Sequence, residues 1–152
     1  MLYRLILFLI LNFGALALGG LFTNNGVNSE WYANLNKAPW TPLGWVFGFA
    51  WTTIMICFSI YMAKAYTIIA DKNSLLALFV VQWILNVVWN PLFFHYHLVS
   101  LSLFTIIALT SVVGFMLFYY RSQMNLASLL LLPYFLWLLI AASLNGYVVF
   151  KN

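Results

Sequence analysis

The sequence predicts an all-α membrane protein, a bundle of five transmembrane helices with a long ordered first loop, and three observations lead to this fold class. Of the 152 residues, 66% are hydrophobic and 5% are charged, whereas about a quarter of the residues of a soluble domain are charged. The apolar residues form long runs separated by short polar connections. A spanning helix needs about 20 apolar residues, so the length suits five spans and leaves no room for a separate soluble domain.

Five segments are expected to cross the membrane, at residues 2–22, 45–66, 75–94, 98–120 and 126–150. Backbone polar groups in lipid must be satisfied within the protein, and these runs show little of the alternation that barrel strands require. Each run is close to the length that a hydrocarbon layer of about 30 Å demands. We therefore expect residues 1–152 to form one five-helix membrane domain.

The first segment has a feature of a secretory signal, because Arg4 precedes an apolar run. This run continues to Phe22, longer than the core of about 7–15 residues usual in a signal, so we expect a retained helix. Ala15 and Gly19 are four residues apart on one face, a spacing that lets another helix approach closely. That contact lies either within the bundle or in a dimer.

The charges favour one orientation and exclude one class of partner. With five spans, four basic residues share the side of the N-terminus and two share the other side: Arg4, Lys64, Lys72 and Arg121 against Lys37 and Lys151. Because basic residues favour the cytoplasmic side, we expect the N-terminus inside and the first loop and the C-terminus outside. The basic residues are scattered singly, whereas a nucleic-acid-binding protein concentrates them on one surface.

The first connection, residues 23–44, is the longest and the most aromatic. Asparagine, glycine and serine are expected to break the first helix there, and two prolines stiffen the return: Asn24, Asn25, Gly26, Asn28, Ser29, Pro39 and Pro42. Four of the seven tryptophans lie within or just after it: Trp31, Trp40, Trp45 and Trp51. A long ordered connection in a compact bundle is uncommon unless it covers something. We expect a lid over one mouth of the bundle, with flat rings that stack on a flat ligand.

The third predicted helix carries three amides, Gln82, Asn86 and Asn90, at intervals of four. Amides at bilayer depth are costly unless they face the interior and find partners. The stripe is therefore expected to face inward, where the amides either bond to neighbouring helices or orient a ligand. Pro91 adds a further acceptor, because it frees the carbonyl of Val87.

The fifth predicted helix carries Trp137, Ala141 and Leu144 on a common face, and a small residue beside a large ring leaves a slot. Trp51 can face this slot at the depth of Trp137 if the second and fifth helices are neighbours. The alternative for each tryptophan is a role as an anchor in the interfacial aromatic belt.

The sequence lacks the sets of residues that several kinds of chemistry require. His95 and His97 are two apart with no Cys, Asp or Glu nearby, whereas a zinc site needs three or four ligands. No metal site is expected; axial ligation of a haem iron is the weaker alternative to histidines exposed at the interface. The only acids, Glu30 and Asp71, are expected on opposite sides of the membrane, which argues against hydrolytic and phosphoryl-transfer chemistry.

Three stretches carry a family resemblance, and they read WYANLNKAPWTPLGWVFGFAWT (residues 31–52), QWILNVVWNPLFF (82–94) and LLPYFLWLLIAASLN (131–145). The chain resembles the TspO/MBR family, the tryptophan-rich sensory proteins, also called translocator proteins or peripheral-type benzodiazepine receptors. The family usually has Lys-Pro after the loop leucine and Pro-Pro before the second helix. Here Ala38 and Leu43 stand where one proline of each pair is usual.

The resemblance implies a porphyrin-binding protein of a bacterial cell membrane, commonly a homodimer, whose ligand is a tetrapyrrole such as protoporphyrin IX and in some members a sterol or a benzodiazepine-like drug. No cofactor is required. The alternatives are an enzyme that degrades protoporphyrin IX in light and oxygen, with Trp51 and Trp137 as its catalytic residues, and a porphyrin or sterol transporter. By the motifs, the ligand-binding residues are Trp31, Tyr32, Trp40, Trp51, Gln82, Asn86, Trp137, Ala141 and Leu144.

Overall fold

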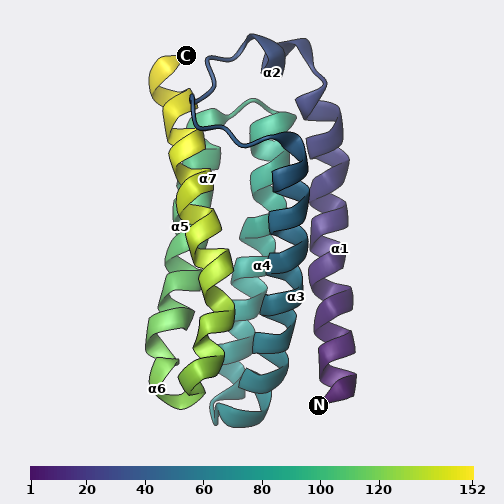
Figure 1. The fold of residues 1–152 in the computed structure, drawn as a ribbon, viewed down its shortest axis with the longest axis vertical. Coiled ribbons are helices and arrows are strands. Elements are labelled where there is room, and N and C mark those ends of the chain that lie inside the picture. The colour runs from purple at the N-terminus through teal and green to yellow at the C-terminus, as the bar shows by residue number, and fades with distance from the viewer.

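The structure, a computed structural model, describes residues 1–152 and contains no strand (Figure 1). Three short helical segments accompany the long helices: α2 (Glu30–Asn34), α6 (Arg121–Met124) and the 3-10 helix η1 (Asn125–Leu131). The long helices are α1 (Leu2–Val27), α3 (Gly44–Ile68), α4 (Lys72–Phe94), α5 (Val99–Tyr119) and α7 (Leu132–Lys151). Five helical segments are long and apolar enough to cross a membrane, the fifth being Arg121–Lys151. The predicted fold class is confirmed.

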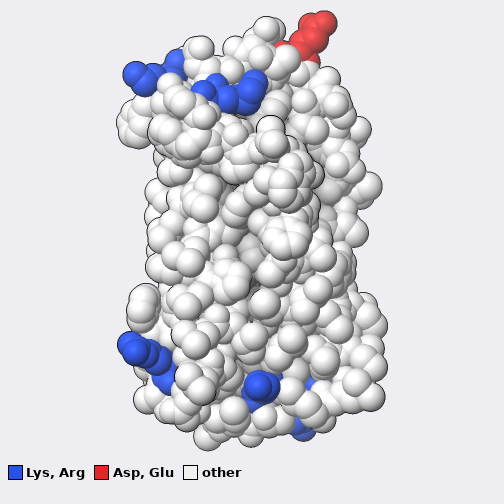
Figure 2. Space-filling model, in the orientation of Figure 1, with Lys and Arg blue, Asp and Glu red and all other residues white.

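The long helices run up and down, so that the N-terminus lies at one end of the bundle and α2 and the C-terminus lie at the other (Figure 1). Helix α1 packs on α3 and α4, α4 packs on α5, α5 packs on α7, and α7 returns to α3. We call the end with α2 and residues 28–43 the loop end. The opposite end, which carries Arg4, Lys64, Lys72 and Arg121, is the basic end. Figure 2 shows charges at the two ends and a broad uncharged middle.

Helix α1 is longer than predicted. The expectation that Asn24, Asn25 and Gly26 break the helix is wrong, because the helix continues to Val27 and ends at Asn28. The Asn28 side-chain amide donates to the carbonyl of Asn24 at 2.8 Å, which satisfies one of the carbonyls left free at a helix end. Gly26 lies within this helix and lets the Phe94 ring approach closely, because a Cβ at this position would collide with that ring.

The fifth span also begins differently from the prediction, which placed one helix over residues 126–150. Residues Asn125–Leu131 form the 3-10 helix η1, and α-helix begins only at Leu132. Asn125 has φ = 50°, a left-handed conformation that asparagine tolerates. Pro133 lies in the first turn of α7, where its fixed φ suits a helix start and no backbone donor is needed.

The most completely buried large side chains lie in the half of the bundle toward the basic end and in its middle, among them Phe58, Tyr61, Met62, Leu75, Met116 and Tyr134. Phe58 is central, because its ring contacts the rings of Tyr61, Phe79 and Tyr134. Every buried residue of α3 lies from Ile54 onward, and none lies among its first ten residues. The hydrophobic core is therefore complete in this half, which we call the basic half, and less complete in the loop half.

Polar side chains and a glycine join α1 to its neighbours. The Asn12 amide donates to the Ser59 hydroxyl at 2.9 Å, and the Thr23 hydroxyl donates to the side-chain carbonyl oxygen of Asn90 at 2.7 Å. A Cβ at Gly19 would lie 2.6 Å from Nδ2 of Asn90, so only glycine permits this approach. The close packing predicted for Ala15 and Gly19 is thus confirmed within the bundle, where both are buried.

Candidate ligand-binding site

The amide stripe of α4 faces inward, as predicted. Gln82 is 2% exposed and Asn86 is 7% exposed. Two of the three amides have partners on other helices, because Gln82 Oε1 accepts from the Tyr134 hydroxyl at 3.0 Å and Asn90 accepts from Thr23. The amide of Asn90 donates to the backbone carbonyl of Asn86 at 3.1 Å, not to that of Val87. The side chain of Asn86 itself makes no hydrogen bond.

Trp137 is the second inward-facing residue with an unmet polar group. It is 8% exposed, and its indole Nε1 is buried without any hydrogen-bond acceptor. Trp137 follows Tyr134 by three residues along α7, and Asn86 follows Gln82 by four along α4, so both lie about one turn nearer the loop end than the Tyr134–Gln82 bond. Buried polar groups without partners are rare in native proteins and call for an explanation. The indole Nε1 of Trp137 is such a group, and the amide of Asn86, which is 7% exposed and makes no hydrogen bond, lies in the same layer. Together they indicate a place for a ligand with hydrogen-bonding groups.

Helix α3 supplies aromatic rings to the same region. Phe47 meets the Trp137 ring edge-on, with ring centroids 5.3 Å apart, and Trp51 meets the Tyr134 ring edge-on at 6.0 Å. The second and fifth spans are therefore neighbours, as the predicted slot between Trp51 and Trp137 requires. Trp51 lies about one turn further from the loop end than Phe47. Ala141 is buried one turn nearer the loop end than Trp137, and Leu144, about one further turn toward the loop end, is half-buried.

The first part of the loop covers the turn between α4 and α5. The Trp31 ring stacks on His97, with centroids 3.9 Å apart and planes 14° from parallel, and meets Phe93 edge-on at 5.6 Å. Tyr32 leans on Phe94 with ring centroids 5.7 Å apart. Burial raises the pKa of the Tyr32 phenol. Helix α2 is thus fixed by its rings to the end of α4.

The second part of the loop is tied to the end of α7. The backbone N–H of Asn36 donates to the side chain of Asn152 at 2.8 Å, and the Asn152 amide donates back to the carbonyl of Asn36 at 3.2 Å. Trp40 is 53% exposed, donates from Nε1 to the Ser143 hydroxyl at 3.1 Å and meets Tyr147 edge-on. Residues 28–43 therefore cross the loop end from the α4–α5 turn to α7 (Figure 1), the position expected of a lid.

The two histidines are exposed in the turn after α4, as predicted. His97 has φ = 55° and stacks on Trp31, whereas the His95 ring lies edge-on to Tyr96 at 4.7 Å. No group of three or more His, Cys, Asp or Glu side chains is close enough to hold a metal ion.

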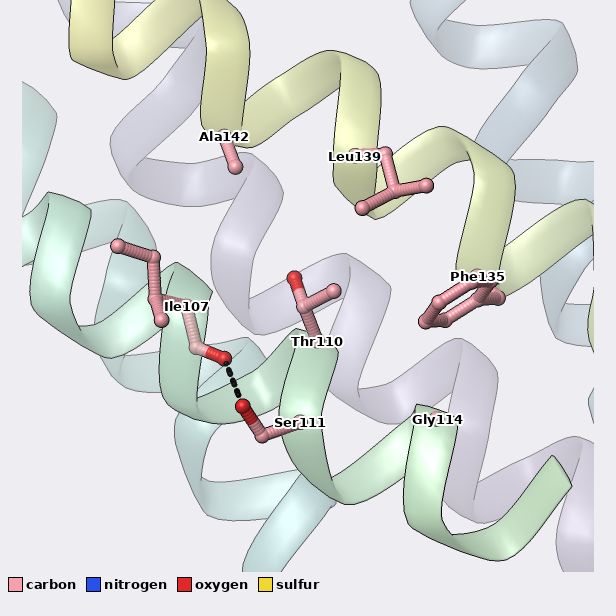
Figure 3. Close-up of a pocket in the computed structure, with 7 residues that line it drawn as sticks. All are labelled: Ile107, Thr110, Ser111, Gly114, Phe135, Leu139 and Ala142. Atoms are coloured by element: carbon pink, nitrogen blue, oxygen red, sulfur yellow. Dashed lines mark hydrogen bonds between the residues drawn. The ribbon is translucent and has the colours of Figure 1, made fainter. Parts of the chain in front are cut away.

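A hollow on the outer side of the bundle offers a contrast to this interior region. It lies between α5 and α7, has a volume of about 300 Å³ and contains none of the predicted ligand-binding residues (Figure 3). Its two hydroxyls already donate to carbonyls of their own helix, Thr110 to Ile106 and Ser111 to Ile107. Since Ile107 and Leu139 at its rim are exposed, this hollow faces the lipid and has no unmet polar group.

Comparison with known proteins identifies the family. The sequence model of the TspO/MBR family matches residues 6–150. The chain belongs to the TspO/MBR family. Among its relatives, the tryptophan-rich protein TspO of Archaeoglobus fulgidus is 36% identical over 135 residues, which cover 88% of this chain and 87% of the relative. Protein CrtK of Rhodobacter capsulatus is 33% identical (76% and 74% covered), and the translocator protein of Sus scrofa is 30% identical (90% and 84% covered).

Sequence reasoning missed three residues of the candidate site in this TspO/MBR protein: Phe47, Tyr134 and His97. Phe47 and Tyr134 had a usable signal, because Phe47 precedes Trp51 by four residues and Tyr134 precedes Trp137 by three, which places each pair on one helix face. The stacking of His97 on Trp31 had no sequence signal, because the two residues lie in connections that are far apart in the sequence. The structure buries Gln82, Asn86, Trp137 and Ala141 and leaves Trp51 and Leu144 half-buried, while Trp31, Tyr32 and Trp40 lie in the loop at the loop end.

Proposed function

We propose that this TspO/MBR protein binds a tetrapyrrole, with protoporphyrin IX as the type of ligand, in the loop half between α3, α4 and α7. The observation that carries the proposal is the buried indole N–H of Trp137 without an acceptor, in the same layer as the unpaired amide of Asn86. A porphyrin supplies what both lack, because its carboxylates and pyrrole nitrogens accept hydrogen bonds. Membership in the family supports this ligand class.

The surroundings suit a flat amphipathic ring. Ligand sites are mostly apolar with a few placed polar groups, and here the aromatic and aliphatic side chains of Phe47, Trp51, Ala141 and Leu144 accompany two polar ones. Aromatic side chains stack well on extended ring systems. The first ten residues of α3 bury no side chain fully, so a ligand seated there would complete the core that the loop half lacks.

A porphyrin titration in detergent tests the proposal. Saturable quenching of tryptophan fluorescence together with a shift of the porphyrin absorbance band is expected, and a Trp137→Ala, Asn86→Leu double variant is expected to lose both. If the folded wild-type protein shows neither signal, the proposal fails. Illumination of the same samples distinguishes a binder from an enzyme, since only an enzyme gives product bands that depend on the protein. Movement of porphyrin across sealed vesicles would identify a transporter.

The orientation is part of the proposal, with the N-terminus inside and the loop end outside. It follows from the four basic residues at the basic end against two at the loop end, since basic residues favour the cytoplasmic side. Single cysteines at Asn28 and Asn152, in a Cys57→Ser background, are expected to react with an impermeant maleimide in intact cells. Labelling of neither in intact cells, with labelling of both after lysis, would invert the orientation.

A further inference from the structure

We propose that a groove between α4 and α5 at the basic end binds one glycerophospholipid whose headgroup carries a primary ammonium, as in phosphatidylethanolamine. The groove has a volume of about 540 Å³ and lies at the opposite end of the bundle from the candidate porphyrin site. Its lining is mostly apolar, with polar residues at the end where α4 begins, and includes Asp71, Ser74, Leu78, Val81, Phe115 and Gln123.

The polar end of the groove presents an ionised carboxylate. Asp71 precedes α4 and accepts from the backbone N–H of Ser74 at 3.1 Å. Hydrogen bonds from Ser74 lower the pKa of Asp71. The adjacent cation is engaged elsewhere, because the Lys72 ammonium donates to the carbonyl of Ile69 and lies 5.3 Å from the centre of the Tyr66 ring. A carboxylate accepts several hydrogen bonds at once, so Asp71 remains available to a cationic donor.

The apolar part of the groove has the depth of a lipid chain. From Asp71 to Val81 is ten residues of helix, about 15 Å at 1.5 Å per residue, or about half of a hydrocarbon layer of about 30 Å. Leu78 and Val81 of α4 and Phe115 of α5 line the groove. Phe115 lies one turn from Tyr119, whose ring stacks on the Phe115 ring with centroids 4.8 Å apart. The groove thus runs from the membrane interface to the middle of the bilayer, as one acyl chain does.

The charge of Asp71 selects among headgroups. A primary ammonium offers three N–H donors to a carboxylate, whereas a choline headgroup offers none and an anionic glycerol headgroup is repelled. The rest of the basic end favours the opposite choice, since Arg4, Lys64, Lys72 and Arg121 attract anionic lipid. A preference for the amine lipid therefore reports on this groove and not on the general field of the basic end.

Native mass spectrometry of the full chain, equilibrated with equal mole fractions of phosphatidylethanolamine, phosphatidylcholine and phosphatidylglycerol, tests the proposal. We expect a single retained lipid, with the ethanolamine lipid favoured about tenfold over the glycerol lipid, the size of effect typical of a charge-assisted hydrogen bond. Asp71→Asn removes the charge but keeps a residue that caps helices equally well. It is expected to reduce the preference to within about twofold, an estimate that assumes Asp71 is its only source.

A matched pair of variants tests the apolar part. Val81→Trp fills the groove and is expected to abolish the retained lipid, whereas Val80→Trp, on an exposed position of α4 that does not line the groove, is expected to keep it. Equal retention of all three lipids by the wild type, an unchanged preference in Asp71→Asn, or a lipid still retained by Val81→Trp would each overturn the proposal. So would a lipid-free dimer that Val81→Trp disrupts, because a second copy would then occupy the groove. Porphyrin affinity serves as a separate readout, because it tests the other site.

Discussion

The basic half and the loop half of this bundle differ in how they fill their interiors. In the basic half, the Phe58 ring has no exposed surface and contacts Tyr61, Phe79 and Tyr134. In the loop half, the buried Nε1 of Trp137 on α7 lacks a hydrogen-bond partner, and so does the side-chain amide of Asn86 on α4. A well-packed apolar interior stabilises a fold, whereas unmet polar groups cost stability unless something binds them. The difference suggests that stability and binding are allotted to opposite halves of the same helices.

The boundary between the halves crosses individual helices, and α3 shows it most clearly. Its buried residues begin at Ile54, while Phe47 and Trp51 on the preceding turns are only half-buried. On α7 the boundary falls between Tyr134, which is hydrogen-bonded to Gln82, and Trp137, which is not bonded. Substitutions on either side of this boundary should therefore affect different measurements.

The largest expected effect is on stability, from Phe58→Ala in the basic half. Removing a fully buried phenyl ring costs about 3–5 kcal/mol, and we expect a loss of this size in the free energy of unfolding in detergent. The porphyrin affinity of the folded fraction should change little, because Phe58 lies nearer the basic end than the Tyr134–Gln82 bond and the candidate site lies nearer the loop end. Phe49→Ala on the same helix is the control, since Phe49 is exposed. A stability loss as small as that of the control would mean that the basic half is not the stabilising core.

The next effect is on ligand affinity, from Trp51→Ala and Trp137→Ala in the loop half. Loss of one stacking ring costs about 1–3 kcal/mol by analogy with bases stacked on aromatic side chains, or about fivefold to 150-fold in the dissociation constant for protoporphyrin IX. Trp45→Ala is the matched control, because Trp45 is exposed on α3. Unchanged affinity in both alanine variants, with the protein folded, would remove these two residues from the site.

A smaller effect is expected on the rate of ligand exit, from Trp31→Ala in the loop. This substitution removes the stack on His97 and the edge contact with Phe93, so the loop should open more often. Changes within one binding interface act mostly on dissociation, and stopped-flow measurement of porphyrin release should show a faster rate with a nearly constant melting temperature. A lower melting temperature with an unaltered release rate would mean that the loop is an interface anchor.

These predictions also show what the sequence could and could not supply. Hydropathy determined the five spans, because length and apolarity are properties of single segments. It missed the last turn of α1, where Gly26 is helical and Phe94 packs against it. It also missed η1, whose start depends on the positive φ of Asn125. Both exceptions are decided by contacts or dihedral angles that a run of apolar residues does not encode.

The site was predictable to a similar depth. The spacing of Gln82 and Asn86 predicted that both amides face the interior. It did not tell which of them bonds to a neighbouring helix and which could orient a ligand. The structure separates them, because Gln82 has Tyr134 as its partner and Asn86 has none. Helix periodicity tells which side chains share a face, whereas the partner across the bundle depends on how α4 and α7 are aligned.

The smallest expected effects come from Tyr134 and Asn86, which lie on either side of the boundary between the two halves. Tyr134→Phe keeps the ring and removes only the bond to Gln82, so it should cost about 0.6 kcal/mol and at most about 1.7 kcal/mol, the average and the maximum measured for interhelical hydrogen bonds in a membrane protein, with unchanged porphyrin affinity. Asn86→Leu should do the reverse, weakening porphyrin binding about fivefold to tenfold, as expected for one net hydrogen bond, without loss of stability. Unfolding and porphyrin titration of both variants decide between the roles. If Asn86→Leu lowered stability and left affinity intact, Asn86 would be a packing residue, and the unpaired indole of Trp137 alone would support a ligand in the loop half.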